Sequence, residues 1–244
     1  MNQVSLYQAQ AACQSGVSLD SRQSALLSTI LACLEARQSP SVVELSFGNG
    51  ALSLALLKVR SDLTLTAVDI APTLIQHLSA EASRLGPEYS NRLRLVEANL
   101  DLDFPLIPSS SADLLVAIDI MEHIFDVFAF VQHCRRVLKP SGVLLLRVPN
   151  IAYLTHRLRL LFGALPVTSS WYGPRNDFSS WKDRYAWDGG HLHYFNLWSL
   201  RQLLSLYGLS VIRASDAGAR GEAFRNLWPD LLAGNLTLTC VVRE

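Results

Sequence analysis

The chain has 244 residues, of which 50% are hydrophobic, so it is long enough to bury one substantial core. Its 21 Lys and Arg balance its 21 Asp and Glu, which leaves no net field to attract nucleic acid or an acidic membrane. The first basic residue is Arg22 and no apolar run approaches the ~20 residues that cross a bilayer. We therefore expect a cytoplasmic protein without a signal peptide, a membrane span or a nucleic-acid partner.

In chain order, short apolar runs alternate with segments of helical spacing. Residues 18–37 begin with cap-type residues and carry apolar side chains at helical spacing, so they predict a helix. Strands are then predicted over 41–46, 63–70, 92–100, 113–120 and 142–150, and helices over 51–60, 73–85 and 128–139. This alternation predicts right-handed βαβ units, and hence an α/β fold with a doubly wound, mostly parallel sheet.

Beyond Asn150 the alternation fails for about forty residues, and a segment of that length in a compact domain is usually functional or mobile. A helix over 196–208 and strands over 209–215 and 236–242 close the chain. We predict one domain in four parts: an N-terminal helical segment, a core, an insertion, and a final helix with closing strands. These parts span 1–38, 39–150, 151–195 and 196–244.

The turn after the first strand reads SFGNG. In doubly wound sheets the first such turn carries glycines, which let the backbone approach a ligand at the carboxyl ends of the strands. Glu44 lies inside the preceding strand, where a carboxylate needs a reason to be buried. Asp69 ends the next strand, where an acid can accept both hydroxyls of a ribose or cap the helix near Pro72.

This combination resembles motif I of class I S-adenosylmethionine-dependent methyltransferases, whose pattern is acid-x-Gly-x-Gly-x-Gly. Glu44, Gly48 and Gly50 match, and Ser46 replaces the first glycine. The later segments VDI, EANL, SADLLVAIDIMEH and VLKPSGVLLLRVPN follow the order of that family. The resemblance implies a seven-stranded Rossmann-like sheet, with S-adenosylmethionine as cofactor and S-adenosylhomocysteine as product. The cofactor contacts that it implies are Glu44, Ser46, Phe47, Gly48, Asn49, Gly50, Asp69, Ile70, Asn99, Leu100, Ala117, Ile118 and Asp119.

Several alternatives remain open in this set. We expect Ser46 to keep a negative φ and to aim its hydroxyl at the methionine carboxylate, whereas a lost or weakened cofactor site is the rival interpretation. Asn99 lines the adenine end or only shapes its turn. A dinucleotide fingerprint through Ser46, Gly48 and Ala51 would indicate a nicotinamide-dependent oxidoreductase, but that fingerprint does not require Glu44.

A second group, Asp119, Glu122 and His123, follows the fourth strand. Its spacing places the three side chains on one face if the turn is helical. His123 is then a general base that Glu122 orients, or the trio resembles the metal ligands of quinone O-methyltransferases, with Asp119 in place of their glutamate. The simplest alternative is a helix N-terminus with a satisfied histidine. We expect no metal, because two carboxylates and one imidazole are an incomplete shell.

The insertion resembles the part of small-molecule methyltransferases that covers the acceptor, and is nearest to the methionine-biosynthesis W proteins. The matching residues are Pro149, Asn150, Arg157, Leu158, Leu160, Leu161, Gly163, Pro166 and His191. The resemblance makes His191 a further catalytic candidate, and His193 shares its face in an extended segment. The aromatic residues pack the loop or line an acceptor pocket: Trp171, Tyr172, Trp181, Tyr185 and Trp187.

Six of the basic residues between positions 135 and 159 form one set. Two interpretations are open: they attract an anionic acceptor or a partner protein, or they form a solvated helix face. The set is Arg135, Arg136, Lys139, His156, Arg157 and Arg159.

The sequence thus predicts methyl transfer from S-adenosylmethionine to an oxygen or nitrogen of a small-molecule acceptor, with His123 as the base where the acceptor must lose a proton. The alternative is a non-catalytic or regulatory protein of the same fold that acts through a partner enzyme, since methionine-biosynthesis W proteins are associated with homoserine acyltransferase. Ser46 favours this alternative, whereas Asp69 and the Glu122–His123 pair favour an enzyme. A homodimer is also open.

Overall fold

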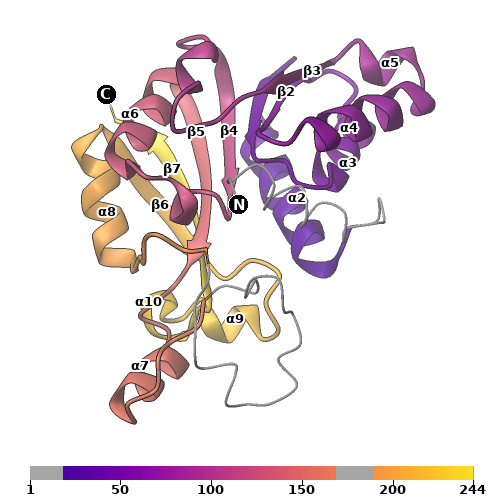
Figure 1. The fold of residues 1–244 in the computed structure, drawn as a ribbon. Helices are drawn as coiled ribbons and strands as arrows, with labels where there is room; N and C mark the ends of the chain where they lie inside the picture. The colour runs from indigo at the N-terminus through magenta and orange to yellow at the C-terminus, as the bar shows by residue number, and fades with distance from the viewer. Residues whose placement is uncertain (1–18, 169–189, 244) are drawn as a thin grey trace.

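The structure, a computed structural model, describes residues 19–168 and 190–243. Its centre is a seven-stranded sheet in the order β3-β2-β1-β4-β5-β7-β6 (Figure 1). The strands are β1 (Ser41–Leu45), β2 (Thr64–Asp69), β3 (Leu93–Glu97), β4 (Ala112–Ile118), β5 (Leu138–Pro149), β6 (Leu209–Ser215) and β7 (Asn235–Val242). The pairs among β1 to β5 are parallel, and β7 is antiparallel to both β5 and β6. The predicted α/β, mostly parallel seven-stranded sheet is confirmed.

Helices cover both faces of the sheet. The α-helices are α2 (Ser21–Leu34), α3 (Ala51–Val59), α4 (Pro72–Leu85), α5 (Pro87–Ser90), α6 (Val127–Val137), α7 (Leu154–Leu161), α8 (Leu197–Leu206), α9 (Glu222–Arg225) and α10 (Pro229–Leu232). Two 3-10 turns are η1 (Phe104–Leu106) and η2 (Met121–His123). Apolar side chains of α2, α3 and α4 form one core with the sheet, and those of α6 and α8 form the other. The fold is therefore doubly wound.

The helix starts follow from the sequence. The Asp20 carboxylate accepts a hydrogen bond from the backbone N–H of Gln23, and the Gln23 side chain accepts one from the backbone N–H of Asp20, so α2 begins with a capping box. The Asp126 carboxylate caps α6 by accepting from two backbone N–H groups. The predicted helix over 18–37 is therefore shorter than expected at both ends.

Helix α7 is an element that sequence analysis missed. It projects from the rest of the molecule at the lower left of Figure 1. Leu158 and Leu161 are exposed on it, and His156 is its buried residue. Leu154, Leu158 and Leu161 do recur at helical spacing, but they are exposed and the helix has only eight residues, so the period was short and easily overlooked. The five aromatic residues expected in the insertion, Trp171, Tyr172, Trp181, Tyr185 and Trp187, lie outside the described residues.

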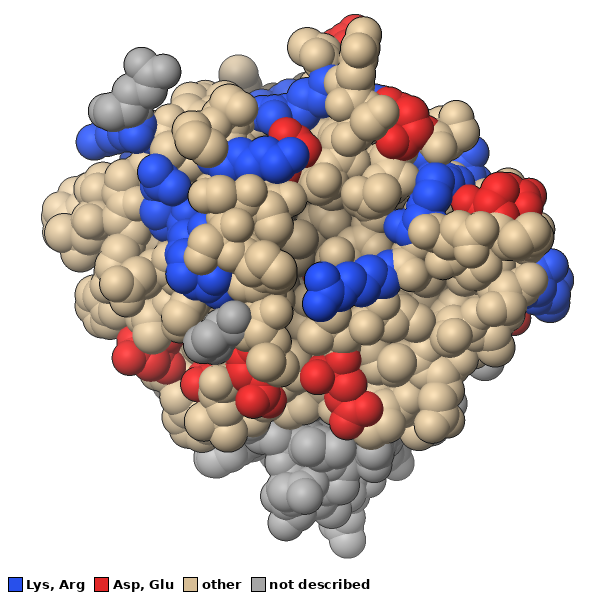
Figure 2. All heavy atoms as spheres, turned by 90° about the horizontal axis from the view of Figure 1, so that it is seen from above, with Lys and Arg blue, Asp and Glu red and all other residues tan. Residues whose placement is uncertain are grey.

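The expected group of basic residues divides between the two ends of β5. Lys139 lies at the start of β5 and pairs with Asp113 at 2.6 Å, whereas Arg157 follows the end of β5 on α7 and pairs with Asp230 at 3.1 Å. The five steps from Leu138 to Val143 match only two steps of β4, so the two ends of β5 lie roughly 25 Å apart. Figure 2, seen from above Figure 1, shows Lys and Arg interspersed with Asp and Glu, unlike the basic stripe typical of nucleic-acid binding.

No helix in the described ranges combines the length and apolar character that a bilayer crossing requires.

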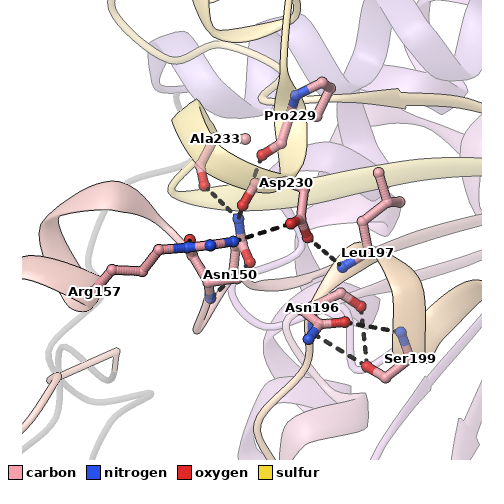
Figure 3. A network of polar contacts seen from close by, with 9 residues as sticks. Asn150, Arg157, Asn196, Leu197, Ser199, Pro229, Asp230 and Ala233 are labelled. Carbon is pink, nitrogen blue, oxygen red and sulfur yellow. Dashed lines mark hydrogen bonds and ion pairs between the residues drawn. The ribbon is translucent and has the colours of Figure 1, made fainter. Parts of the chain in front are cut away.

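Asn150 joins the end of β5 to the closing part of the chain (Figure 3). Its side chain is fully buried, and its amide nitrogen donates to the carbonyl oxygens of Asp230 and Ala233 at 2.9 Å each. The Asp230 carboxylate in turn accepts from Arg157 of α7 at 3.1 Å and from the first N–H of α8, that of Leu197, at 3.2 Å. One buried amide thereby positions the segments on both sides of the insertion.

Replacing Asn150 with Ala should lower the free energy of unfolding by about 2–4 kcal/mol, because several buried carbonyl groups lose their donor at once. Urea unfolding followed by circular dichroism measures this loss. The matched control is Asn91→Ala at an exposed position, which should change stability by less than about 0.5 kcal/mol. Equal effects of the two substitutions would contradict this role of Asn150.

Candidate functional site

The turn after β1 has alternating left-handed residues. The φ angles of Ser46, Gly48 and Gly50 are 56°, 60° and 73°. The expectation that Ser46 keeps a negative φ is therefore wrong. The backbone N–H of Ser46 donates to the carbonyl of Val68 at 2.7 Å, so the turn keeps its pairing with β2 while it reverses direction. Ser46 adopts the conformation of the glycine that it replaces, at a cost of about 1 kcal/mol.

The two glycines have different reasons to be glycine. A Cβ built on Gly48 would meet no atom within 4 Å, so this side of the turn is open to a ligand. A Cβ on Gly50 would lie 2.8 Å from Cδ1 of Leu78, so Gly50 lets α4 pack closely against the start of α3. The loop therefore combines an open edge with a tightly packed base.

Asp69 holds the turn from the neighbouring strand. Its carboxylate accepts hydrogen bonds from the N–H of Gly48 at 3.3 Å and of Ala71 at 3.0 Å. Burial raises the pKa of Asp69 above its ordinary value, although these backbone donors oppose the shift. The side chain thus holds Ala71, the residue before α4, but α4 has no side-chain cap, so the capping alternative is wrong in that form. Each carboxylate oxygen has two lone pairs, so this support is compatible with hydrogen bonds to ribose hydroxyls.

Glu44 lies beneath the turn and is 6% exposed. Its carboxyl group accepts a hydrogen bond from the Ser53 hydroxyl of α3. Burial raises the pKa of Glu44 to about 7. The hydrogen bond from Ser53 lowers this pKa, whereas the negative charge of Asp69 raises it. The acid of the motif is therefore positioned from both β1 and α3.

The other residues of the expected cofactor set have mixed environments. Phe47 is buried in the core, and the Asn49 side chain accepts from the N–H of Ala51 at 3.1 Å. The Asn99 side chain accepts from the N–H of Asp101 at 3.0 Å, so it does shape its own turn. The remaining members lie at or beside strand ends with their side chains buried or half-buried: Ile70, Leu100, Ala117 and Ile118.

Asp119 follows β4 and also has a left-handed backbone, with φ of 51°. One of its carboxylate oxygens lies 3.3 Å from Nη1 of Arg147, a residue of β5 that is 6% exposed. The Asp119 side chain lines a cavity and is 44% exposed, and desolvation by the surrounding chain raises its pKa against the opposing charge of Arg147. Sequence analysis missed Arg147, for which an arginine within the apolar run VLLLRVP was the available signal.

Glu122 and two histidines come together beside this pair. Nε2 of His191 lies 4.0 Å from a carboxyl oxygen of Glu122, and the rings of His123 and His191 meet edge to face at 4.9 Å. The backbone carbonyl of Glu122 accepts from the N–H groups of Leu192 and His193, which fixes this segment against η2. Both insertion histidines therefore face the same turn, as the alternation of His191 and His193 predicts.

The protonation of Glu122 follows from its surroundings. Its side chain is 2% exposed, and one carboxyl oxygen has no hydrogen-bond partner. Burial, followed by the negative charge of Asp119, raises the pKa of Glu122 well above its ordinary value. These surroundings thus favour the protonated form of Glu122.

Three of these residues also have the spacing of metal ligands. Glu122, His123 and His191 each offer one ligand atom, and these atoms lie within 4.8 Å of one another. The trio differs from the expected one, because Asp119 pairs with Arg147 and His191 takes its place. Two imidazoles and one carboxylate with an open fourth position are also the donor set of catalytic zinc sites, so the expected absence of a metal stays an untested prediction.

A cavity of about 450 Å³ lies at this edge of the sheet, and this size suits a small molecule. Its described lining includes Asp119, Glu122, His123, Arg147, Arg159 and His191. The residues that the sequence placed in two groups thus occupy one carboxyl edge, with the glycine turn at β1 and the polar cavity beyond β4 and β5. This is the position where ligands bind in doubly wound sheets.

Comparison with known proteins assigns this arrangement to a family. A family model described as a methyltransferase domain matches residues 19–214, which include the whole of the edge described above. The chain belongs to this methyltransferase family. Together with the loop geometry, the comparisons assign S-adenosylmethionine as its cofactor.

Curated relatives of this methyltransferase-family chain match parts of it. A Mycobacterium tuberculosis protein named as a probable S-adenosylmethionine-dependent methyltransferase is 34% identical over 84 residues, which are 34% of this chain and 27% of that protein. The ubiquinone biosynthesis O-methyltransferase of Xanthomonas axonopodis pv. citri is 28% identical over 120 residues, or 48% and 47% of the two chains. The chain thus spans from about a quarter to a half of the length of these relatives.

Solved structures support the fold of the family. A Haloferax volcanii methyltransferase, solved in complex with the Trm112 methyltransferase activator, matches with a TM-score of 0.67 at 16% identity. The match covers 100% of this chain and 98% of that one, so the two share the whole fold.

Replacing Ser46 with Gly should leave the free energy of unfolding within about 1 kcal/mol of wild type, because the relief of left-handed strain offsets the greater freedom of glycine in the unfolded chain. Ser46→Val should lose more than about 2 kcal/mol, because a β-branched residue resists this conformation. Thermal unfolding of the three proteins measures both effects. A destabilising glycine with a tolerated valine would contradict the observed turn.

The stability of the protein without cofactor should fall as pH rises from about 5 to about 8, and part of that fall should depend on Glu44. Its folded pKa of about 7 exceeds the ordinary 4.5, so the folded state keeps a proton that the unfolded chain releases in this window. Glu44→Gln should remove a contribution of no more than about 3 kcal/mol to that fall. Urea unfolding at several pH values tests this; Glu35→Gln, at an exposed position, is the control.

If the pH dependence of Glu44→Gln matched that of wild type, the raised pKa of Glu44 would be refuted.

Proposed function

We propose that this protein transfers the methyl group of S-adenosylmethionine to an oxygen or nitrogen of a small-molecule acceptor. The observation that carries the proposal is the single carboxyl edge that joins the glycine turn and Asp69 to a polar cavity lined by Glu122, His123 and His191. The turn and Asp69 bind the cofactor, and the cavity holds the acceptor. The partial length of the curated matches leaves the acceptor to be identified by experiment.

The reaction asks little covalent chemistry of the protein. A sulfonium is an excellent leaving group, so the main tasks are to align the acceptor with the methyl group and to exclude water. A base is needed only where the acceptor must lose a proton. Glu122 is a poorer candidate, because burial and the charge of Asp119 raise its pKa and so favour its protonated form.

His123 has the geometry of that base. Its Nδ1 lies 2.7 Å from the carbonyl oxygen of Gly190, which can only accept a hydrogen bond. Nδ1 therefore carries the proton in the neutral ring, and Nε2 is the basic nitrogen. The His191 ring packs edge to face on this ring, and Glu122 lies within 4.8 Å of its ligand nitrogen, so both neighbours restrict its orientation.

The second candidate function is a regulatory protein that acts through a partner. The Haloferax volcanii relative in fold was solved with an activator protein, which illustrates such an association for that methyltransferase. The substitution of Ser46 was the sequence feature that favoured this function. Because Ser46 adopts the glycine conformation, that feature no longer indicates a disabled loop.

His123→Ala should lower kcat for hydroxyl acceptors by about 10²–10⁴-fold and leave the affinity for S-adenosylhomocysteine unchanged. The assay follows tritium transfer from methyl-labelled S-adenosylmethionine to a panel of small phenols, alcohols and amines, with His77→Ala on α4 as the matched control. An unchanged kcat would remove His123 from the proposal. If the protein binds the cofactor but transfers the methyl group neither to any member of the panel nor to any compound in a small-molecule extract, the regulatory function is favoured.

Activity should survive removal of divalent metals with EDTA, because the account uses no metal. The same transfer assay, before and after dialysis against the chelator, measures this. Loss of activity that Zn²⁺ or Mg²⁺ restores, together with loss in Glu122→Gln, would instead make Glu122, His123 and His191 metal ligands.

A further inference from the structure

Arg147 has more donors than the described structure satisfies. A guanidinium carries five N–H donors in a fixed plane. The side chain is 7% exposed, its ion pair with Asp119 spans 3.3 Å, and its Nε is buried without a hydrogen-bond partner. A buried donor without an acceptor costs about 1–3 kcal/mol, so a stability role alone explains Arg147 poorly.

Arg147 is placed so that its N–H donors can reach an acceptor molecule in the cavity. It lies near the end of β5, pairs in register with Thr237 of β7, and lines the cavity of about 450 Å³. The Thr237 hydroxyl is likewise buried without a partner. The Nε of Arg147 and the hydroxyl of Thr237, both buried without a hydrogen-bond partner, thus belong to one paired position of β5 and β7.

The cavity is also more basic than acidic. Arg22 at the start of α2 and Arg159 of α7 line it together with Arg147. Only two carboxyl groups, those of Asp119 and Glu122, line the described cavity beside these three guanidinium groups, and Asp119 is already paired with Arg147. Arg22 is close enough to Asp119 to lower the pKa of that carboxylate. An anion in this cavity would therefore meet net positive charge in a site of reduced dielectric constant, where the attraction is strong.

We propose that the acceptor is an acid: a small molecule that carries a carboxylate or phosphate group, which Arg147 binds with the help of Arg22, besides the hydroxyl or amine that is methylated. The inference rests on the proposed function, because it assigns the cavity to the acceptor. Guanidinium groups pair with both anions through two parallel hydrogen bonds, so carboxylate and phosphate share this recognition. The anion fixes one end of the acceptor and leaves its nucleophile near His123.

The test compares an acid with an uncharged amide of equal size, and adds a small anion, on protein saturated with S-adenosylhomocysteine. The probes are 3,4-dihydroxybenzoate, its uncharged amide 3,4-dihydroxybenzamide, and inorganic phosphate, each titrated by calorimetry. The acid should bind at least ~10-fold more tightly than the amide, since a charge-assisted pair contributes more than a neutral one. Phosphate should compete with the acid but not with S-adenosylhomocysteine.

Three variants separate recognition from folding. Arg147→Lys keeps a charge beside Asp119 but loses the bidentate geometry, so it should reduce the preference for the acid severalfold. The double variant Arg147→Met with Asp119→Asn removes both charges of the pair and should abolish the preference. Arg22→Gln, at an exposed position, should weaken acid binding without affecting stability. The matched control is Arg201→Gln on the outside of α8, which should change nothing.

The outcomes separate this inference from the proposed function. If S-adenosylhomocysteine itself fails to bind the folded protein, the proposed function falls and the inference with it. If it binds, but neither the acid nor phosphate binds at millimolar concentration, the inference alone is overturned. The same holds if the amide binds as tightly as the acid, or if Arg22→Gln and Arg147→Lys leave the preference unchanged.

Discussion

The left-handed turn after β1 is the constraint on which the site depends. Three alternate residues of that turn have positive φ, and this conformation exposes the backbone edge at Gly48 while it returns the chain into α3. Asp69 fastens the turn from β2, and Glu44 supports it from below. Ser46 shows that the conformation, rather than the glycine, is what the turn requires.

Four acids surround this edge, three of them buried and Asp119 exposed, and each has a different counterpart. Glu44 meets a serine hydroxyl, Asp69 meets backbone N–H groups, Asp119 meets an arginine, and Glu122 lies near a histidine. Desolvation raises the pKa of all four. The cofactor carries a positive sulfonium, so its binding favours ionised carboxylates nearby, and ligand binding and proton release should be coupled.

The sequence predicted the features that depend on local pattern. Parallel strands buried on both faces are continuous apolar runs, so β1, β4 and β5 were recognisable, and acids at their ends located the edge. The negative φ predicted for Ser46 was wrong, because the turn between β1 and α3 requires a left-handed residue there and outweighs the preference of serine for negative φ. Helix α7 lacks a buried stripe, and the contact between Glu122 and His191 joins distant segments. Such contacts appear only when the fold brings them together.

The central claim is that the turn and Asp69 form a working cofactor site. Calorimetric titration of the purified protein with S-adenosylhomocysteine and with NAD, repeated on Asp69→Ala, tests it most directly. The account predicts micromolar binding of S-adenosylhomocysteine, at least ~10-fold weaker binding to the variant, and no binding of NAD. A folded protein that binds neither nucleotide, or that binds NAD instead, would contradict the claim.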